Sequence, residues 1–339
     1  MPELWYAVLA LTLTTYAVLD GFDFGAGVLH LFVAKNETER RTVFGAIGPF
    51  WDGNEVWLIA AGGVMFLAFP VLLTTAFPAF YLSLFIVVWC LMLRGISIEL
   101  RSHVDNPEWR TFWDVLFALA SALLALLFGV ALANIVRGLP LDSDEANTLP
   151  LFTHFRTTGQ VGLLDWYTLL VGAFSLALLT LHGALFLQYR AQADLKHRCA
   201  AIERHLRWPI LALFTAVSVA TQHVRPDFFQ SLVTRPLAWL ALAIALAGLW
   251  LITRPPRSAF TRFLGSSALI AGLLASLAVA LFPTFLRSTL DPSHSLDLAR
   301  ATSGTYGRNV ALYWWPFAFA LAATYVVLAF RAHRGPVQR

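Results

Sequence analysis

The sequence predicts an all-α integral membrane protein with about nine transmembrane helices. Of its 339 residues, 58% are hydrophobic and only 13% are charged, and the mean hydropathy is +0.67. A soluble domain carries roughly 25% charged residues, so this chain has too few to cover a water-facing surface of its size. The apolar residues also fall in blocks of ~20, the length that crosses a bilayer. In lipid, each block can satisfy its own backbone only as a helix.

The whole chain, residues 1–339, is expected to form a single polytopic domain. Its apolar blocks lie at 4–34, 51–74, 77–100, 110–137, 164–189, 206–224, 236–253, 259–283 and 310–331. The first block has no basic residue before Lys35, unlike a cleaved signal peptide, so we expect a retained helix. A short repeat, Val-Ala-Leu before an arginine, occurs at 130–137 and 279–287. We therefore expect two four-helix bundles, at 1–137 and 164–283, and a final helix at 310–331.

The basic residues predict the orientation of the chain. Seventeen of the 24 Lys and Arg residues lie near the connections after the first, third, fifth and seventh blocks or in the C-terminal tail, as Arg40, Arg198 and Arg257 do. By the positive-inside rule, the N-terminus is periplasmic and the C-terminus cytoplasmic. Because no soluble domain carries these basic residues, we interpret them as topology signals, and we do not expect the chain to bind nucleic acid. The long polar connections at 138–163 and 284–309 fall on the outer side, where they could cap a partner or a pocket.

Two cysteines are too few for a zinc site of the usual spacing. Cys90 lies inside an apolar block and Cys199 in a polar connection, so we expect no disulfide.

Two carboxylates lie deep in the first block. Asp20 and Asp23 are three residues apart and share a helix face. Both lie ~15–25 Å from an interface, where a carboxylate costs at least ~2.5 kcal/mol unless it faces protein or water. Gly21, Gly25 and Gly27 predict close packing beside them, against a partner subunit or against the second helix, which carries Gly62 and Gly63.

A second acidic pair opens the second block, near its cytoplasmic end. Asp52 and Glu55 share a face, with Asn54 between them and Trp57 following. Asp52 alone could be a helix N-cap. The four acids together predict a ladder for protons from the cytoplasm toward the middle of the membrane, and the competing interpretation is structural hydrogen bonding between helices.

The histidines do not predict a haem site. His182 lies near the middle of the fifth block and His30 near the cytoplasmic end of the first, but no two helices each carry a pair of buried histidines. We expect His182 to be hydrogen-bonded. Arg94 and Glu99 are expected to pair with each other or to extend toward the interface.

The stretches Leu19-Asp-Gly-Phe-Asp-Phe-Gly-Ala-Gly27, Asn36-Glu-Thr-Glu-Arg-Arg41 and Pro49-Phe-Trp-Asp-Gly-Asn-Glu-Val-Trp-Leu-Ile-Ala-Ala-Gly-Gly63 resemble subunit II of the cytochrome bd-type quinol oxidases, including the cyanide-insensitive branch. The strong similarity covers roughly residues 15–82.

This resemblance implies an inner-membrane subunit of a terminal oxidase of aerobic respiration, without redox centres of its own. Subunit I, the expected partner, would carry haem b and haem d, or haem b alone, and bind quinol. The complex would oxidise quinol and reduce O2 to water with protons from the cytoplasm. Asp52 would then be the proton entrance, with Asp20 or Asp23 further along, and Trp57 would lie where the family can form an apolar route for oxygen. The family also allows small single-helix accessory subunits and a structural quinone or lipid on this chain.

Two other function classes compete with this interpretation. A multi-pass proton-coupled transporter or channel would use the same ladder, but usually with polar groups in both halves. Here the polar residues are concentrated in the first two helices. A cytochrome in its own right would need the histidine pairs that the sequence lacks.

Overall fold

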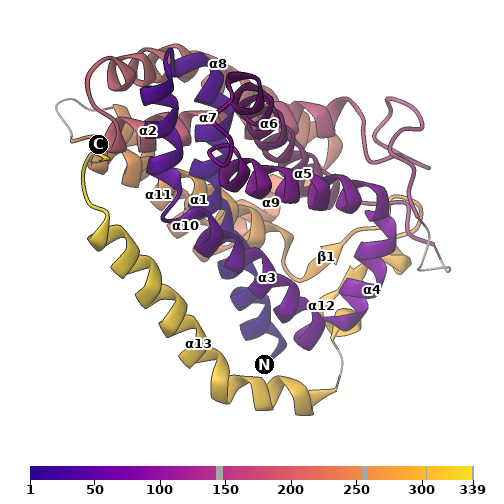
Figure 1. Cartoon of the computed structure of the whole chain (residues 1–339). Helices are drawn as coiled ribbons and strands as arrows, with labels where there is room; N and C mark the ends of the chain where they lie inside the picture. The colour runs from indigo at the N-terminus through magenta and orange to yellow at the C-terminus, as the bar shows by residue number, and fades with distance from the viewer. Residues whose placement is uncertain (143–147, 254–257, 303, 338–339) are drawn as a thin grey trace.

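The computed structural model describes residues 1–142, 148–253, 258–302 and 304–337, and it is almost entirely helical (Figure 1). Arg254, Arg257 and Arg339, which contributed to the charge asymmetry of the sequence, lie outside these residues. The helices are α1 (Pro2–Val33), α2 (Glu37–Ile47), α3 (Trp51–Ala68), α4 (Pro70–Ala79), α5 (Tyr81–Leu100), α6 (Pro107–Arg137), α7 (Trp166–Arg190), α8 (Ala193–Val224), α9 (Asp227–Thr234), α10 (Pro236–Thr253), α11 (Ala259–Leu281), α12 (Leu298–Ala301) and α13 (Thr305–Ala332). The short elements are β1 (Thr284–Leu286), the 3-10 turn η1 (Pro292–His294) and β2 (Leu296–Asp297).

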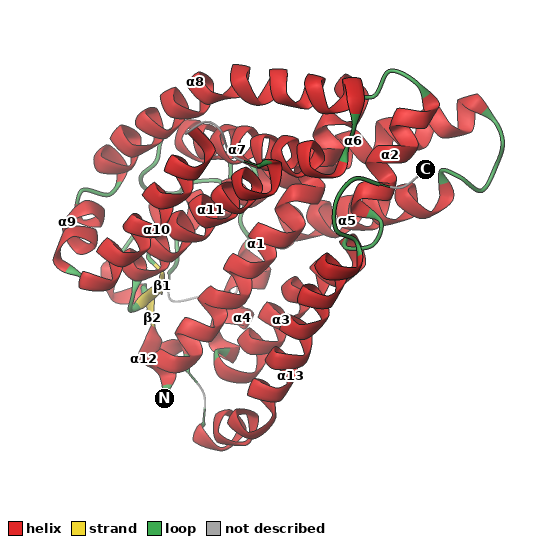
Figure 2. Cartoon of the chain, turned by 90° about the vertical axis from the view of Figure 1, so that its left-hand side faces the viewer, coloured by secondary structure: helices red, strands yellow, loops and turns green. Residues whose placement is uncertain are grey.

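Seven helices in the described part of the chain are long and apolar enough to cross a membrane: α1, α5, α6, α7, α10, α11 and α13. The prediction of an all-helical membrane fold is therefore confirmed, whereas the count of nine spans is not. The two remaining blocks of the prediction, 51–74 and 206–224, fall on α3–α4 and α8. The N- and C-termini lie at opposite ends of the molecule in both views (Figures 1 and 2).

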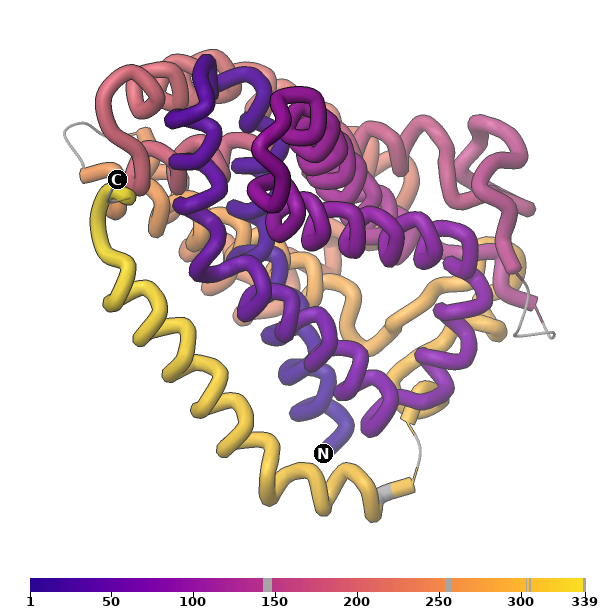
Figure 3. The backbone as a smooth tube through the Cα atoms, in the orientation of Figure 1, coloured from indigo at the N-terminus to yellow at the C-terminus, as the bar shows by residue number. Residues whose placement is uncertain are grey.

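The predicted continuous helix at 51–74 is wrong. α3 ends at Ala68, Phe69 leaves the helical region with φ −135° and ψ 57°, and Pro70 opens α4. A proline has no N–H to donate and its φ suits the first helical turn, so it starts a new helix here. A second bend at Phe80 separates α4 from α5, and the tube in Figure 3 changes direction at both bends.

The sixth block was also predicted too short. α8 begins at Ala193, 13 residues before the apolar stretch, because the charged segment ahead of it continues the same helix. Cys199 therefore lies inside a helix and is fully buried, rather than in a polar connection. Cys90 and Cys199 are both free, in agreement with the prediction of no disulfide.

The close contact at the centre of the fold joins α1 to α7. A Cβ atom added to Gly25 would lie 2.0 Å from the carbonyl oxygen of Leu179 and 2.7 Å from the backbone nitrogen of Gly183. A Cβ at Gly27 would collide with Ser121 of α6. The small residues of α1 thus bring it against α7 and α6, and the expectation that they face the second helix is wrong. No atom lies within 4 Å of a Cβ added to Gly62 of α3, within the described chain.

The two long outer connections pack against each other. Ser288 Oγ donates to the carbonyl of Leu141 at 2.6 Å, and Thr289 Oγ1 donates to that of Gly159 at 2.9 Å. β1 and β2 form a small antiparallel pair within the second connection. Leu139, Leu286, Leu296 and Leu298 join a buried cluster with Trp5 near the start of α1. The connections therefore cover this end of the helices.

Candidate functional site

A buried arginine lies at the centre of the acidic residues on α1 and α3. Arg94 of α5 is completely buried, and its Nη1 and Nη2 donate to Oδ1 and Oδ2 of Asp20 at 2.6 and 3.1 Å. Nη2 also contacts Oε1 of Glu55 at 2.5 Å. Arg94 therefore pairs with the two acids, and the expected pairing with Glu99 is wrong because Glu99 is exposed.

The second acid of α1 is held differently. Asp23 is fully buried, and its Oδ2 accepts a hydrogen bond of 2.8 Å from Nδ2 of Asn54. The same amide group donates to the carbonyl of Leu19 at 3.1 Å, which fixes Asn54 between α3 and α1. Oδ1 of Asp23 has no hydrogen-bond partner among the described residues. Asp20 is thus clamped by two hydrogen bonds from Arg94, while Asp23 keeps one oxygen free.

The acid cluster, defined as Asp20, Asp23, Glu55 and Arg94, holds three carboxyl groups and one guanidinium. The Arg94 guanidinium also lies 4.7 Å from the centre of the Phe24 ring. One cation cannot balance three carboxylates, and uncompensated charge is costly where water is excluded. Such a cluster can take up and release a proton, which is the chemistry that a ladder of acids requires.

Asp52 lies outside this cluster. Its side chain is exposed at the start of α3, and it makes no hydrogen bond or ion pair with any residue that the structure describes. Glu55 lies one turn further along the helix, and its side chain is 25% exposed while it contacts Arg94. Among the predicted site residues, the structure brings Asp20, Asp23 and Glu55 together and leaves Asp52 at the surface.

Trp57 is buried one turn before the middle of α3. Its ring meets that of Phe319 on α13 edge-on, with the ring centres 5.4 Å apart. Tyr16, Phe24 and Cys90 belong to the same apolar cluster. Trp57 therefore belongs to the apolar cluster that also contains Phe24, the ring beside Arg94, and it contacts α13 through Phe319.

A second buried polar cluster lies at the predicted cytoplasmic end of α1. Asp114 of α6 is completely buried, with a 2.7 Å contact between its Oδ1 and Nε2 of His30. Arg101 donates to the same oxygen at 2.5 Å, and Arg40 donates to Oδ2 at 2.7 Å. Arg101 also binds Glu37 of α2 through Nη1 and Nη2, at 3.1 and 2.8 Å. These five residues are called the Asp114 cluster.

The charges of the Asp114 cluster hold Glu37 and Arg101 in their ionised forms. The hydrogen bonds from Arg101 outweigh partial burial and lower the pKa of Glu37 to about 2. Burial alone would disfavour the charge of Arg101, but Glu37 and Asp114 raise its pKa above the ordinary value. Sequence reasoning missed Asp114 and Arg101 because both lie near the ends of apolar blocks, where charged residues usually face water.

His182 is held by two hydrogen bonds inside the protein. Nδ1 lies 2.7 Å from Oγ of Ser266 on α11, and Nε2 lies 2.9 Å from the carbonyl oxygen of Val18 on α1. The expectation that His182 is hydrogen-bonded is confirmed. Both ring nitrogens are engaged, so they do not present a haem ligand in this arrangement. No group of three or more His, Cys, Asp or Glu side chains arranged for a metal ion occurs in the described residues.

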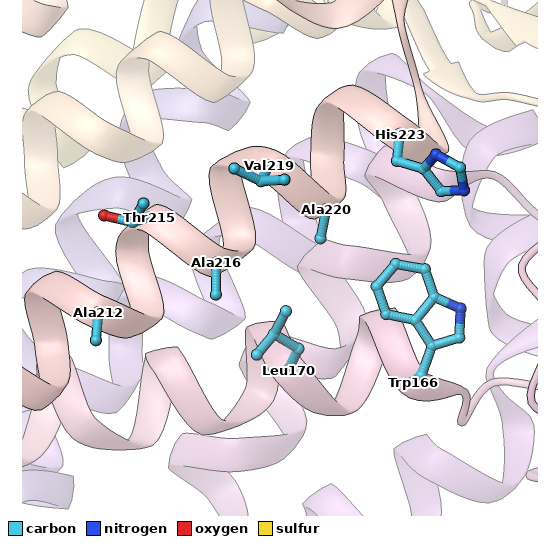
Figure 4. A pocket seen from close by; sticks show the side chains of 8 residues that line it. All are labelled: Trp166, Leu170, Ala212, Thr215, Ala216, Val219, Ala220 and His223. Carbon is cyan, nitrogen blue, oxygen red and sulfur yellow. The ribbon is translucent and has the colours of Figure 1, made fainter.

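An apolar groove of about 720 Å³ lies between α7 and α8. Figure 4 shows Trp166 and Leu170 of α7 on one side and residues of α8 on the other, with Trp166 and His223 at the same end. The groove contains none of the acids described above. It is a surface feature separate from the acid cluster.

Comparisons with known proteins agree along the length of the chain. A sequence model of the family described as "Cytochrome bd terminal oxidase subunit II" matches residues 1–333. The chain is 30% identical to the cytochrome bd-I ubiquinol oxidase subunit 2 of Escherichia coli K12, over 91% of this chain and 87% of the relative. It is 30% identical to the cytochrome bd ubiquinol oxidase subunit 2 of Bacillus subtilis, over 91% and 89%. A chain in the structure of bd oxidase from Geobacillus thermodenitrificans has the same fold, with a TM-score of 0.69, 16% identity, and coverage of 96% of this chain and 97% of that one.

Proposed function

The chain belongs to the cytochrome bd terminal oxidase subunit II family, and we propose that it delivers cytoplasmic protons to the oxygen-reducing site of a partner subunit. As a member, it is an inner-membrane subunit of a quinol:O2 oxidoreductase. The observation that carries the proposal is the acid cluster, in which Asp20 and Glu55 share Arg94 and Asp23 keeps a free oxygen. Dioxygen reduction consumes protons inside a low-dielectric layer, and only titratable groups or water can carry them there.

The proposed route starts at Asp52. Asp52 is exposed and lies one turn before Glu55, which is itself partly exposed and contacts Arg94. A proton received by Glu55 would pass to Asp23, directly or by way of Asp20, and both acids lie deeper on α1. Asn54 supports the route because its hydrogen bond orients the Asp23 carboxyl toward α3. In this role Arg94 is a positioning residue, since it cannot lose its own proton in a protein.

Subunit I is the proposed partner, and the haems are assigned to it. This assignment rests on family membership and on the engagement of both His182 nitrogens by Ser266 and Val18. Haem, held by subunit I, would supply the binding and reduction of oxygen, and quinol would be oxidised at that subunit. Trp57, buried against Phe319, is proposed to line an apolar route for O2. Accessory single-helix subunits and a bound quinone or lipid remain expectations from the family.

We also propose that the two halves of the chain form related bundles, 1–137 and 164–283, with the helix at 310–331 added to them. The crossing of α1 and α7 at Gly25 and Gly183 supports this division, because these are the first helices of the two bundles.

The alternative is a proton-coupled transporter or channel without a redox partner. It would use the same acid cluster, so the cluster does not discriminate between the two. An optical spectrum discriminates between them. The complex purified by an affinity tag on this chain should show haem if it is an oxidase and no haem if it is a transporter. The family relation favours the oxidase.

Replacement of Asp52 tests the proposed route. Because Asp52 is exposed and bonds no described residue, Asp52→Asn is expected to preserve assembly and haem content. Turnover should nevertheless fall about tenfold or more, equivalent to ~1.4 kcal/mol or more on the limiting step. Asp52→Glu should keep much of the activity, since it retains a titratable group. Glu99→Gln is the matched control, because Glu99 is an exposed acid near the same predicted membrane surface. Wild-type oxygen consumption by an Asp52→Asn complex with full haem would make Asp52 only a first-turn acid of α3.

A further inference from the structure

Three of the buried polar atoms that have no hydrogen-bond partner among the described residues lie along one face of α1. They are Nδ1 of His30, Oγ of Ser121 and Oδ1 of Asp23, and each belongs to a side chain that is 0% exposed. Positions 23, 27 and 30 share one face of α1 because they are four and three residues apart. Ser121 of α6 lies against the middle of this face, since a Cβ added to Gly27 would be 2.1 Å from its hydroxyl. These three side chains are called the polar row.

One end of the polar row is continuous with the Asp114 cluster. Nε2 of His30 contacts Asp114, which accepts hydrogen bonds from Arg101, and Arg101 binds Glu37. The Glu37 side chain is 37% exposed, so this chain of contacts reaches water at the predicted cytoplasmic surface. One ring nitrogen of His30 contacts Asp114 on the side of that surface, and the other has no partner in the described part of the chain.

The other end of the row is Asp23 in the acid cluster. Seven residues of α1 separate His30 from Asp23, a rise of ~10 Å. A single hydrogen bond cannot bridge that length, but the Ser121 hydroxyl divides it into two shorter gaps. Buried polar groups that lack a protein partner are usually satisfied by ordered water. Water bound at these three atoms would satisfy them and join the row.

We propose that the polar row is a second proton route from the cytoplasm to Asp23, parallel to the route that starts at Asp52. This inference rests on the proposed function, because both routes supply the acid cluster. Histidine can take a proton at one ring nitrogen and release one from the other. The proton would enter from water at the exposed end of the Asp114 cluster and pass by way of the Asp114 carboxylate to His30, while Arg101 and Glu37 keep their charges. From His30 it would move through water and the Ser121 hydroxyl to the free oxygen of Asp23.

A purely structural serine in this protein looks different. Ser276 of α11 is also buried, and its hydroxyl donates to the carbonyl of Gly272 at 2.8 Å, within its own helix. Ser121 makes no such bond within the described residues. Replacing Ser121 by alanine thus removes a hydroxyl without removing a protein hydrogen bond, which makes it a mild change to the fold.

The test combines the two routes in the assembled oxidase, with oxygen consumption and proton uptake from the cytoplasmic side measured in liposomes and normalised to haem. If Asp52→Asn leaves about a tenth of the turnover, we attribute this remaining turnover to protons that pass through the polar row. Ser121→Ala alone is expected to change turnover by less than about a fifth, but in the Asp52→Asn background it should lower the remainder by about a further tenfold. His30→Gln, which keeps an amide to bond Asp114, should act in the same way. Ser276→Ala is the matched control in both backgrounds.

Equal turnover and proton uptake in Asp52→Asn and in its combination with Ser121→Ala would overturn the second route. Complete loss of turnover in Asp52→Asn alone would also overturn it, while leaving the proposed function in place. The proposed function fails separately, if Asp23→Asn keeps wild-type proton uptake, because both routes converge on Asp23.

Discussion

The ion pair between Arg94 and Asp20 gives a prediction about stability that follows from burial. Both side chains are completely buried, and two hydrogen bonds of 2.6 and 3.1 Å join them. Removing one partner of a buried pair costs ~3–5 kcal/mol, because the other charge is left uncompensated. Arg94→Met should therefore destabilise the chain by about that amount. Asp20→Asn should cost less, since Arg94 keeps its 2.5 Å contact with Glu55.

The double replacement separates this mechanism from a general loss of packing. Adding Asp20→Asn to Arg94→Met removes the stranded carboxylate, so the double variant should be at least as stable as Arg94→Met alone. Arg41→Met is the control, because Arg41 forms an exposed pair with Glu37 and such pairs contribute ~0–1 kcal/mol. The assay is the temperature at which half of the detergent-solubilised complex stays monodisperse and haem-loaded. Wild-type stability for Arg94→Met, or fully additive losses in the double variant, would show that no carboxylate is left uncompensated when Arg94 is removed.

Three further predictions concern the fold, the topology and the cofactor. Gly25→Leu should prevent folding, because its Cβ would lie 2.0 Å from a backbone oxygen of α7. Gly62→Leu, the matched variant, should leave the fold intact and weaken the complex with subunit I. Equal yields of the two folded chains would contradict this prediction. A reporter cysteine at Arg198 should react only from the cytoplasm, as the charge asymmetry predicts, and labelling from outside would reverse the orientation. The chain expressed without subunit I should bind no stoichiometric haem, and a haem spectrum from the isolated chain would direct attention to His182.

Composition alone was enough to predict a helical membrane protein, because lipid leaves a chain few other ways to satisfy its backbone. The breaks at Phe69 and Phe80 were not predicted, since the apolar residues continue through them and only Pro70 marks the first. α8 was predicted too short for the opposite reason. Its first turns carry charged residues on one face and bury Leu195 and Cys199 on the other, so their mean hydropathy is low.

Part of the site could be predicted from the three-residue spacing of acidic side chains. The spacing of Asp20 and Asp23 predicted a shared buried face, and Asn54 and Glu55 on α3 do meet that face. Arg94 was missed because an arginine near a block end usually extends to the interface, and only tertiary structure shows α5 turning it inward. Asp114 and Ser121 were missed because the sequence around a single polar residue in an apolar block does not show which side chains it contacts.

In the proposed function, Asp23 carries the protons that this subunit delivers. The most direct test of this role is proton uptake from the cytoplasmic side of liposomes that contain the Asp23→Asn oxidase with full haem content. The amide can still bond Asn54, so assembly should be retained. Proton uptake and oxygen consumption are expected to fall together by about tenfold or more. Wild-type uptake with a full haem complement would contradict it.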